Sequence, residues 1–316
     1  MLLKLVPAET KVRFMRWRRV GFILSAALLI GSLALVGVRG LNLGIDFLGG
    51  TLIEVQTDGP ADLGWFRGEL NGLNLGEVSL QEFGAPDTVL IRIQRQEGGE
   101  EAQLAALQIA KDAIDERVVE YRRQEFVGPT IGAELQEAAI YAVLSALAAI
   151  MLYIWFRFEW QFGLGAIIAL THDVIATMGL FALLQLEFNL STVAAVLTIA
   201  GYSINDTVVV YDRVREKIRK YKRMPFEELF DFALNKTLSR TLMTSATTLL
   251  ALTALALFGG EVIRGFAIAL IFGVVIGTYS SVMVAVPLLL YLRPRRGDEE
   301  AAPGEGSGSG PAASEA

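Results

Sequence analysis

The sequence has no cysteine and a single histidine, and these two absences remove several classes of function at once. Without cysteine, the chain forms no disulfide and offers no thiolate as a nucleophile or metal ligand. One histidine is too few for a histidine-rich metal site, and the sequence shows no nucleotide-binding loop and no catalytic triad. We therefore expect a protein that is not an enzyme, with no metal, no cofactor and no nucleic-acid partner.

Apolar residues are abundant: they make up 53% of the 316 residues, and the mean hydropathy is +0.46, which is high for a soluble protein. A membrane-spanning helix needs roughly 20 apolar residues. Six stretches are long enough, and we predict a six-span membrane protein with spans at residues 20–38, 136–156, 162–186, 190–211, 238–258 and 263–292. The first span resembles a signal peptide, but its apolar run is too long, so we interpret it as a retained anchor.

Basic residues gather in three places: before the first span, after the fourth and after the sixth. Short loops rich in lysine and arginine face the cytoplasm. We therefore expect both termini inside, with residues 1–19 as a cytoplasmic N-terminus and a cytoplasmic loop at about 212–237. Residues 293–316 are predicted to form a cytoplasmic tail, disordered because Gly, Ser, Ala and Glu dominate its composition.

Residues 39–134 are polar and should form a small domain outside the membrane, while residues 135–292 hold the remaining five spans. Alternating apolar residues predict strands at 51–57, 77–83, 88–94 and 118–126, with a turn at 84–87. Helices are expected at 61–73 and 100–117. The order β-α-β-β-α-β indicates an α+β, ferredoxin-like sandwich, a fold that hosts many functions.

The loop between the fourth and fifth spans is basic and then acidic and aromatic. Pro225 can open a short helix on which Phe226, Leu229, Phe230 and Ala233 share one face. Such a helix could lie on the cytoplasmic membrane surface. Alternatively, the basic residues of this loop serve to set the topology.

Away from the first few residues at the outer span ends, charge or an imidazole ring occurs in the predicted spans at His172, Asp173, Asp206 and Arg240. A charge at mid-membrane costs about 2.5–3.5 kcal/mol on insertion scales. At 1.5 Å per helical residue, Asp206 lies roughly 10 Å and Arg240 roughly 6 Å inside the cytoplasmic boundary. Because their spans run antiparallel, these two side chains can form a charge-assisted pair, which protonation of Asp206 would break.

We expect a polar seam among spans three to six, with neighbours of Asp206 and Arg240 at helical spacing. Its predicted members are Tyr202, Ser203, Asn205, Thr244, Thr247 and Ser280. Other interpretations stay open. The Asp206–Arg240 pair can be a static lock between helices, His172 a hydrogen-bonded core residue, and Asp173 a structural partner; Asn205 and the threonines can join helices without carrying protons.

Several motifs resemble those of the SecD and SecF protein-export family. They are GIDFLGGT (44–51), VGPTIGAEL (127–135), AGYSINDTVVVYDRVRE (200–216) and NKTLSRTLMTSATT (235–248). The resemblance covers roughly residues 10–295, and one small external domain favours the SecF type. The departures are Tyr211, where phenylalanine is common, and Ala200, where isoleucine is common.

The resemblance implies an RND-type half with six spans in a bacterial inner membrane, paired with SecD. It implies association with the SecYEG channel, SecA, an unfolded secretory polypeptide, membrane lipid and a YajC-type small subunit. Asp206 and Arg240 match the family's proton-path residues, with His172 and Asp173 as further candidates. Gly44, Asp46, Gly49 and Gly50 match the motif that opens the external domain, where the last two glycines form a hinge or a simple turn.

Three functions follow from these observations. The first is a subunit that uses the proton motive force to promote protein export after the SecA-driven stage. The second is a half-size RND-type exporter of lipids or small molecules, which should show a deep apolar cleft in its external domain. The third is an assembly factor whose buried charges merely lock helices together.

Overall fold

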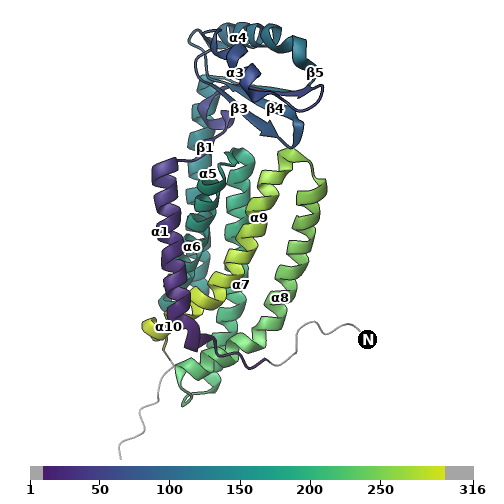
Figure 1. Cartoon of the computed structure of the whole chain (residues 1–316). Helices are drawn as coiled ribbons and strands as arrows, with labels where there is room; N and C mark the ends of the chain where they lie inside the picture. The colour runs from purple at the N-terminus through teal and green to yellow at the C-terminus, as the bar shows by residue number, and fades with distance from the viewer. Residues whose placement is uncertain (1–9, 296–316) are drawn as a thin grey trace, which may run out of the picture.

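A computed structural model describes residues 10–295, and it shows a small sheet domain stacked on one end of a helix bundle (Figure 1). Among these residues, six helical stretches are long and apolar enough to cross a membrane, as predicted. They run over Phe14–Arg39, Thr130–Arg157, Trp160–Leu184, Leu190–Lys220, Phe226–Phe258 and Val262–Leu292. The predicted tail lies outside the described residues from position 296 onward, as do residues 1–9 of the predicted N-terminus.

The individual helices are a 3₁₀ turn η1 (Phe14–Trp17), α1 (Arg18–Arg39), α5 (Pro129–Arg157), α6 (Trp160–Leu184), α7 (Leu190–Lys220) and α8 (Phe226–Phe258). The last stretch is composite. It begins as α9 (Glu261–Ser280), passes through the π-helical segment η3 (Ser281–Ala285) and ends as α10 (Val286–Leu292). A π-helical turn inside an α-helix often marks a functional position.

The loop expected at 212–237 is much shorter, because α7 and α8 both continue past the predicted span ends and leave residues 221–225 between them. The predicted apolar face exists at the start of α8, but it does not lie on a membrane surface. Leu229, Phe230 and Ala233 are all 0% exposed and pack into the main core of the bundle. The apolar face of this helix therefore packs against protein and not against lipid.

The sheet domain comprises β2 (Gly50–Thr57), α3 (Leu63–Asn71), β3 (Val78–Phe83), β4 (Ala85–Ile93), α4 (Gly99–Ile114), the 3₁₀ turn η2 (Asp115–Arg117) and β5 (Val118–Val127). Its antiparallel strands lie in the order β3-β4-β2-β5, which is the predicted ferredoxin-like arrangement. The turn is tighter than the predicted 84–87, since β4 already begins at Ala85 and Gly84 takes a φ of 79°. Ile53, Val55, Phe66, Ile91 and Ile114 form part of a dry core under the two helices.

Two short strands join the sheet domain to the bundle. β1 (Asn42–Leu43) follows α1, and β6 (Glu187–Phe188) connects α6 to α7. They pair in parallel, Asn42 opposite Glu187 and Leu43 opposite Phe188. The short helix α2 (Ile45–Leu48) then leads from β1 into β2. The external domain is thus hydrogen-bonded to the connection between two spans as well as tethered by the chain.

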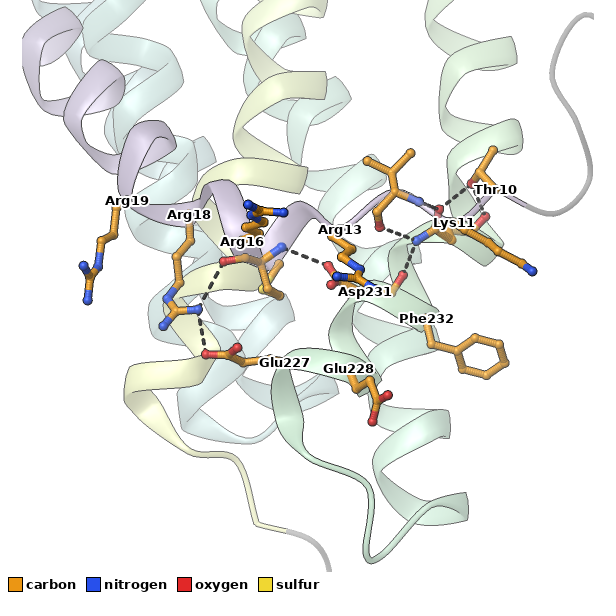
Figure 2. Close-up of a pocket in the computed structure, with 13 residues that line it drawn as sticks. Thr10, Lys11, Arg13, Arg16, Arg18, Arg19, Glu227, Glu228, Asp231 and Phe232 are labelled. Carbon is orange, nitrogen blue, oxygen red and sulfur yellow. Dashed lines mark hydrogen bonds and ion pairs between the residues drawn. The ribbon is translucent and has the colours of Figure 1, made fainter.

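At the opposite end of the bundle, the segment before α1 crosses the start of α8 (Figure 2). Asp231 Oδ1 accepts a 2.9 Å hydrogen bond from the Met15 backbone N–H, and Asn235 Oδ1 accepts one of 2.9 Å from Val12 N–H. Arg18 pairs with Glu227 at 2.6 Å. Met15 is 1% exposed, so this crossing segment is an integral part of the fold.

Candidate functional site

Asp206 lies on α7 and faces α8, with 9% of its surface exposed. Its Oδ1 accepts a 2.8 Å hydrogen bond from the Thr241 hydroxyl. Its Oδ2 is buried, and no hydrogen-bond partner for it exists within residues 10–295. Since a buried charge with an unsatisfied oxygen is costly, the surroundings of Asp206 leave its charge state open to change.

The predicted Asp206–Arg240 ion pair does not form between the described residues. Arg240 lies on the exposed side of α8 and helps to line a hollow of about 240 Å³ beside Asp212, Glu216 and Lys236. Successive residues turn by about 100° around a helix, so α8 presents Thr241 to Asp206 in place of Arg240. Arg240 still lies within electrostatic reach of the carboxylate.

Asp173 and His172 lie on α6 at the centre of the bundle, 0% and 1% exposed. Asp173 Oδ1 lies 2.9 Å from His172 Nδ1. Asp173 Oδ2 accepts hydrogen bonds from the hydroxyls of Ser280, at 2.7 Å, and of Ser203. Asp173 is therefore well satisfied as an anion, whereas His172 Nε2 is buried without a hydrogen-bond partner among the described residues.

The structure brings together three of the six predicted seam residues. Besides Ser203 and Ser280, Tyr202 donates a 3.3 Å hydrogen bond to Ser245, which lies 2.7 Å from the Thr278 hydroxyl. The other three lie on exposed faces. Thr244 donates to the backbone carbonyls of Arg240 and Thr241 in its own helix, and Thr247 donates to those of Met243 and Thr244. Asn205 faces away from the seam.

The seam also contains residues that the sequence analysis did not select. Thr207 lies 2.9 Å from Ser281, Thr241 contacts Asp206, and Ser25 on α1 lies 3.0 Å from the Tyr279 hydroxyl. Thr241 and Ser245 are four residues apart and so share a helix face, a spacing that could have identified them. Counting from Arg240 at helical spacing selects Thr244 and Thr247, which lie on the neighbouring face of α8.

Glycines let α7 and α9 approach closely around this seam. A Cβ added at Gly277 would lie 3.1 Å from Ser203 Cβ, and one at Gly273 would overlap the side chain of Ile199. This contact holds Ser203 and Ser280 against Asp173. The glycine pair thus serves the packing role typical of small residues between membrane helices.

The predicted motif of the external domain sits where that domain meets the bundle. Asp46 Oδ2 accepts a 2.9 Å hydrogen bond from the Leu190 backbone N–H, the first residue of α7. A Cβ on Gly44 would lie 2.7 Å from Glu187 Oε1. Gly49 has a φ of 72°, and a Cβ on Gly50 would lie 2.5 Å from the Ile93 carbonyl oxygen. All four residues therefore shape the junction between α1 and β2.

A second polar contact closes the same junction. Arg92 Nη1 donates to Asn42 Oδ1 at 3.0 Å and to the Leu43 carbonyl at 3.2 Å, while Nη2 lies 3.6 Å from Glu187 Oε2. Burial raises the pKa of Glu187, and the nearby Arg92 opposes that rise without cancelling it. The junction therefore contains a carboxyl group that holds a proton more strongly than an exposed glutamate does.

The sequence matches two family models and is similar to several known proteins. Residues 108–295 match the family "Protein export membrane protein SecD/SecF, C-terminal", and residues 34–61 match the "SecD/SecF GG Motif". A protein translocase subunit SecF of Rhodobacter capsulatus is 46% identical, over 96% of this chain and 95% of the relative. The SecF subunit of Rickettsia rickettsii is also 46% identical, over 91% of this chain and 94% of its own length.

Two solved structures share the architecture. A crystal structure of SecDF, a translocon-associated membrane protein from Thermus thermophilus, matches with a TM-score of 0.83 at 35% identity. A SecDF structure in a super-membrane-facing form matches with a TM-score of 0.64 at 37% identity. They match 93% and 94% of this chain, which in each case spans 40% of the solved chain.

Proposed function

The chain belongs to the SecD/SecF family of protein-export membrane proteins, and from this premise we propose that it acts as a proton-driven SecF-type subunit of a protein translocase. The observation that carries the proposal is Asp206, a carboxylate within a membrane-spanning helix with one hydrogen-bonded and one unpartnered oxygen. A carboxylate in such a position is a typical proton carrier. The role is transport, with no catalytic step.

The energy available is sufficient for such a role. Moving one proton through 100 mV supplies about 2.3 kcal/mol. Since about 1.4 kcal/mol changes an equilibrium tenfold, one proton can shift a two-state element by roughly fortyfold. α7 connects the proposed proton site to the external domain, because it carries Asp206 and its first backbone N–H donates to Asp46 of the external-domain motif.

We place the sheet domain outside the cytoplasm and both termini inside, in the inner membrane of a bacterium. The basic segment before α1 and the basic end of α7 lie at the end of the bundle opposite the sheet domain, as this orientation requires (Figure 1). In this orientation the sheet domain can reach a polypeptide emerging on the outer side.

A SecD-type subunit is the first partner we propose, and α8 offers it a surface. Arg240, Thr244 and Thr247 lie on the exposed side of this helix, among residues such as Leu242, Met243 and Leu250. A bare arginine at this depth is poorly suited to lipid, and a partner helix would cover it. The SecYEG channel, SecA, a YajC-type subunit and the unfolded secretory chain are further proposed partners.

Two other functions have less support. The half-size exporter of lipids or small molecules is not favoured, since the named relatives are translocase subunits. The core of the sheet domain is filled by its own apolar side chains, such as Ile53 and Phe66, both 0% exposed. A purely structural role for the buried charges predicts that their removal harms assembly, with no separate effect on coupling.

The test is a reconstitution. Vesicles containing SecD, SecYEG and SecA are prepared with and without this chain, and release of a secretory polypeptide is followed under an imposed proton gradient. We expect gradient-dependent release that requires this chain and stops when a protonophore collapses the gradient. Release that is independent of the chain, or failure of the chain to co-purify with SecD, would refute the proposal.

A further inference from the structure

We propose that His172 and Asp173 form a second proton-holding site, which takes its proton at His172 Nε2 and is coupled to Asp206 through the hydroxyls of Ser280, Ser281 and Thr207. This inference rests on the proposed proton-driven function. The site lies wholly inside the bundle, since both side chains are at most 1% exposed.

The hydrogen bonds around Asp173 indicate which nitrogen of the neutral His172 ring carries the proton. Ser203 and Ser280 both donate to Oδ2, and His172 Nδ1 lies 2.9 Å from Oδ1. An ionised carboxylate accepts and never donates, so Nδ1 carries the proton of the neutral ring. The other nitrogen, Nε2, is then a bare acceptor, and it is a buried nitrogen without a hydrogen-bond partner among the described residues.

The charge balance favours a proton at this nitrogen. With a neutral ring, the pair holds one buried negative charge and faces no described cation at hydrogen-bond distance. A proton added to Nε2 makes an imidazolium that Asp173 already orients and neutralises, as a carboxylate does for a histidine in other sites. No bond other than N–H forms, and the proton comes from the transported pool.

The link to Asp206 follows from consecutive serines. Ser280, the last residue of α9, donates to Asp173 on α6 at 2.7 Å. Ser281, the first residue of the π-helical segment, donates 2.8 Å to the Gly277 carbonyl and lies 2.9 Å from the hydroxyl of Thr207, the residue that follows Asp206 on α7. Adjacent helical residues point about 100° apart, so these two hydroxyls reach two different helices, α6 and α7. The π-helical turn begins at this point.

The other elements packed around the pair bring few titratable groups. α9 places the Tyr279 ring 6.2 Å from the His172 ring, and its hydroxyl donates 2.8 Å to the Gly21 carbonyl of α1. α7 brings Asp206, and α1 brings the hydroxyls of Ser25 and Ser32, both buried. Asp206 is thus the acidic group on these elements to which the hydroxyls of Ser280, Ser281 and Thr207 lead.

The chain has one histidine, so His172 can be observed directly in the full-length protein. The protein is prepared with ¹⁵N-labelled histidine in lipid bilayers, and solid-state NMR follows the ring nitrogens with pH. We expect the Nδ1–H tautomer at high pH and an imidazolium at low pH. Asp206→Asn should shift the midpoint of this change, because it removes the acidic group to which the site is coupled.

Asp212→Asn is the matched control, since Asp212 lies six residues further along α7 in an exposed 2.7 Å pair with Arg157 and should leave the midpoint unchanged. Ser280→Ala tests the hydroxyl link without removing a charge and should weaken the response to Asp206→Asn. A ring that stays neutral throughout, or a midpoint that ignores Asp206→Asn, would overturn the inference. Loss of coupling in export with an unresponsive His172 would leave the proposed function standing and reject this site.

Discussion

Removing the Asp46 carboxylate should loosen the first turn of α7. Asn189 caps the third residue of this helix, Thr192, through its own side chain. The first N–H, of Leu190, is instead satisfied from the external-domain motif by Asp46 at 2.9 Å. Asp46→Ala therefore leaves an exposed helix donor to water and removes an anion from the positive end of the helix dipole.

The magnitude follows from these two effects. A hydrogen bond of this kind contributes about 0.5–1.5 kcal/mol, and an anion at a helix N-terminus about 0.3–1 kcal/mol. Because the contact is exposed, we take a total of about 1–2 kcal/mol. At about 1.4 kcal/mol per factor of ten, exchange of the Leu190 amide should accelerate by about five- to thirtyfold. Asp46→Asn, which keeps the acceptor and loses the charge, should show a smaller acceleration.

Hydrogen exchange resolved at Leu190 measures this directly. Asp62→Ala is the control, because Asp62 caps α3 inside the sheet domain through the amides of Gly64 and Trp65. It should loosen α3 and leave Leu190 unaffected. An unchanged Leu190 rate in Asp46→Ala, or equal acceleration by Asp62→Ala, would refute the idea that Asp46 ties the external domain to α7.

Two further predictions concern the domain junction and the helix packing. Because burial raises the pKa of Glu187, its contribution to stability is fully present below the ordinary carboxyl range and is lost as pH rises through the raised folded-state pKa. Thermal unfolding should therefore show extra stability at acid pH, and Glu187→Gln should remove this pH dependence. An unchanged pH profile in Glu187→Gln would contradict the burial argument. Gly273→Ala should destabilise the bundle by about 1–3 kcal/mol because the new methyl group overlaps Ile199, and adding Ile199→Ala should recover part of that loss. Unfolding in detergent measures the stability of the single and double variants. Purely additive effects of the two substitutions would disprove the contact.

Much of the fold could be predicted because its signals are local. The six spans follow from hydrophobic length, and alternation along residues such as Ile53, Val55, Val89 and Ile91 predicts the strands whose inward faces form the domain core. Depth along a helix is also local, since it depends on counting residues. This is why the depth estimate led to the part of α8 around Arg240, next to Thr241, whose hydroxyl contacts the Asp206 carboxylate.

What could not be predicted depends on rotation and on distant contacts. Counting residues does not fix which way α8 faces, so Arg240 was assigned the position that Thr241 occupies. The pairing of Asn42 with Glu187 joins segments far apart in the chain, and each strand has two residues, too few for a sequence pattern. The π-helical turn at Ser281, which aims two adjacent serines at different helices, likewise has no local sequence signal.

The most direct test of the central claim is gradient-driven release with Asp206→Asn, beside Asp212→Asn, in vesicles where both variants assemble with SecD and SecYEG. The account predicts that release under a proton gradient is lost with Asp206→Asn and retained with Asp212→Asn, while the SecA-driven stage continues in both. Undiminished gradient-driven release with Asp206→Asn would contradict the account and leave the buried carboxylate as a structural group.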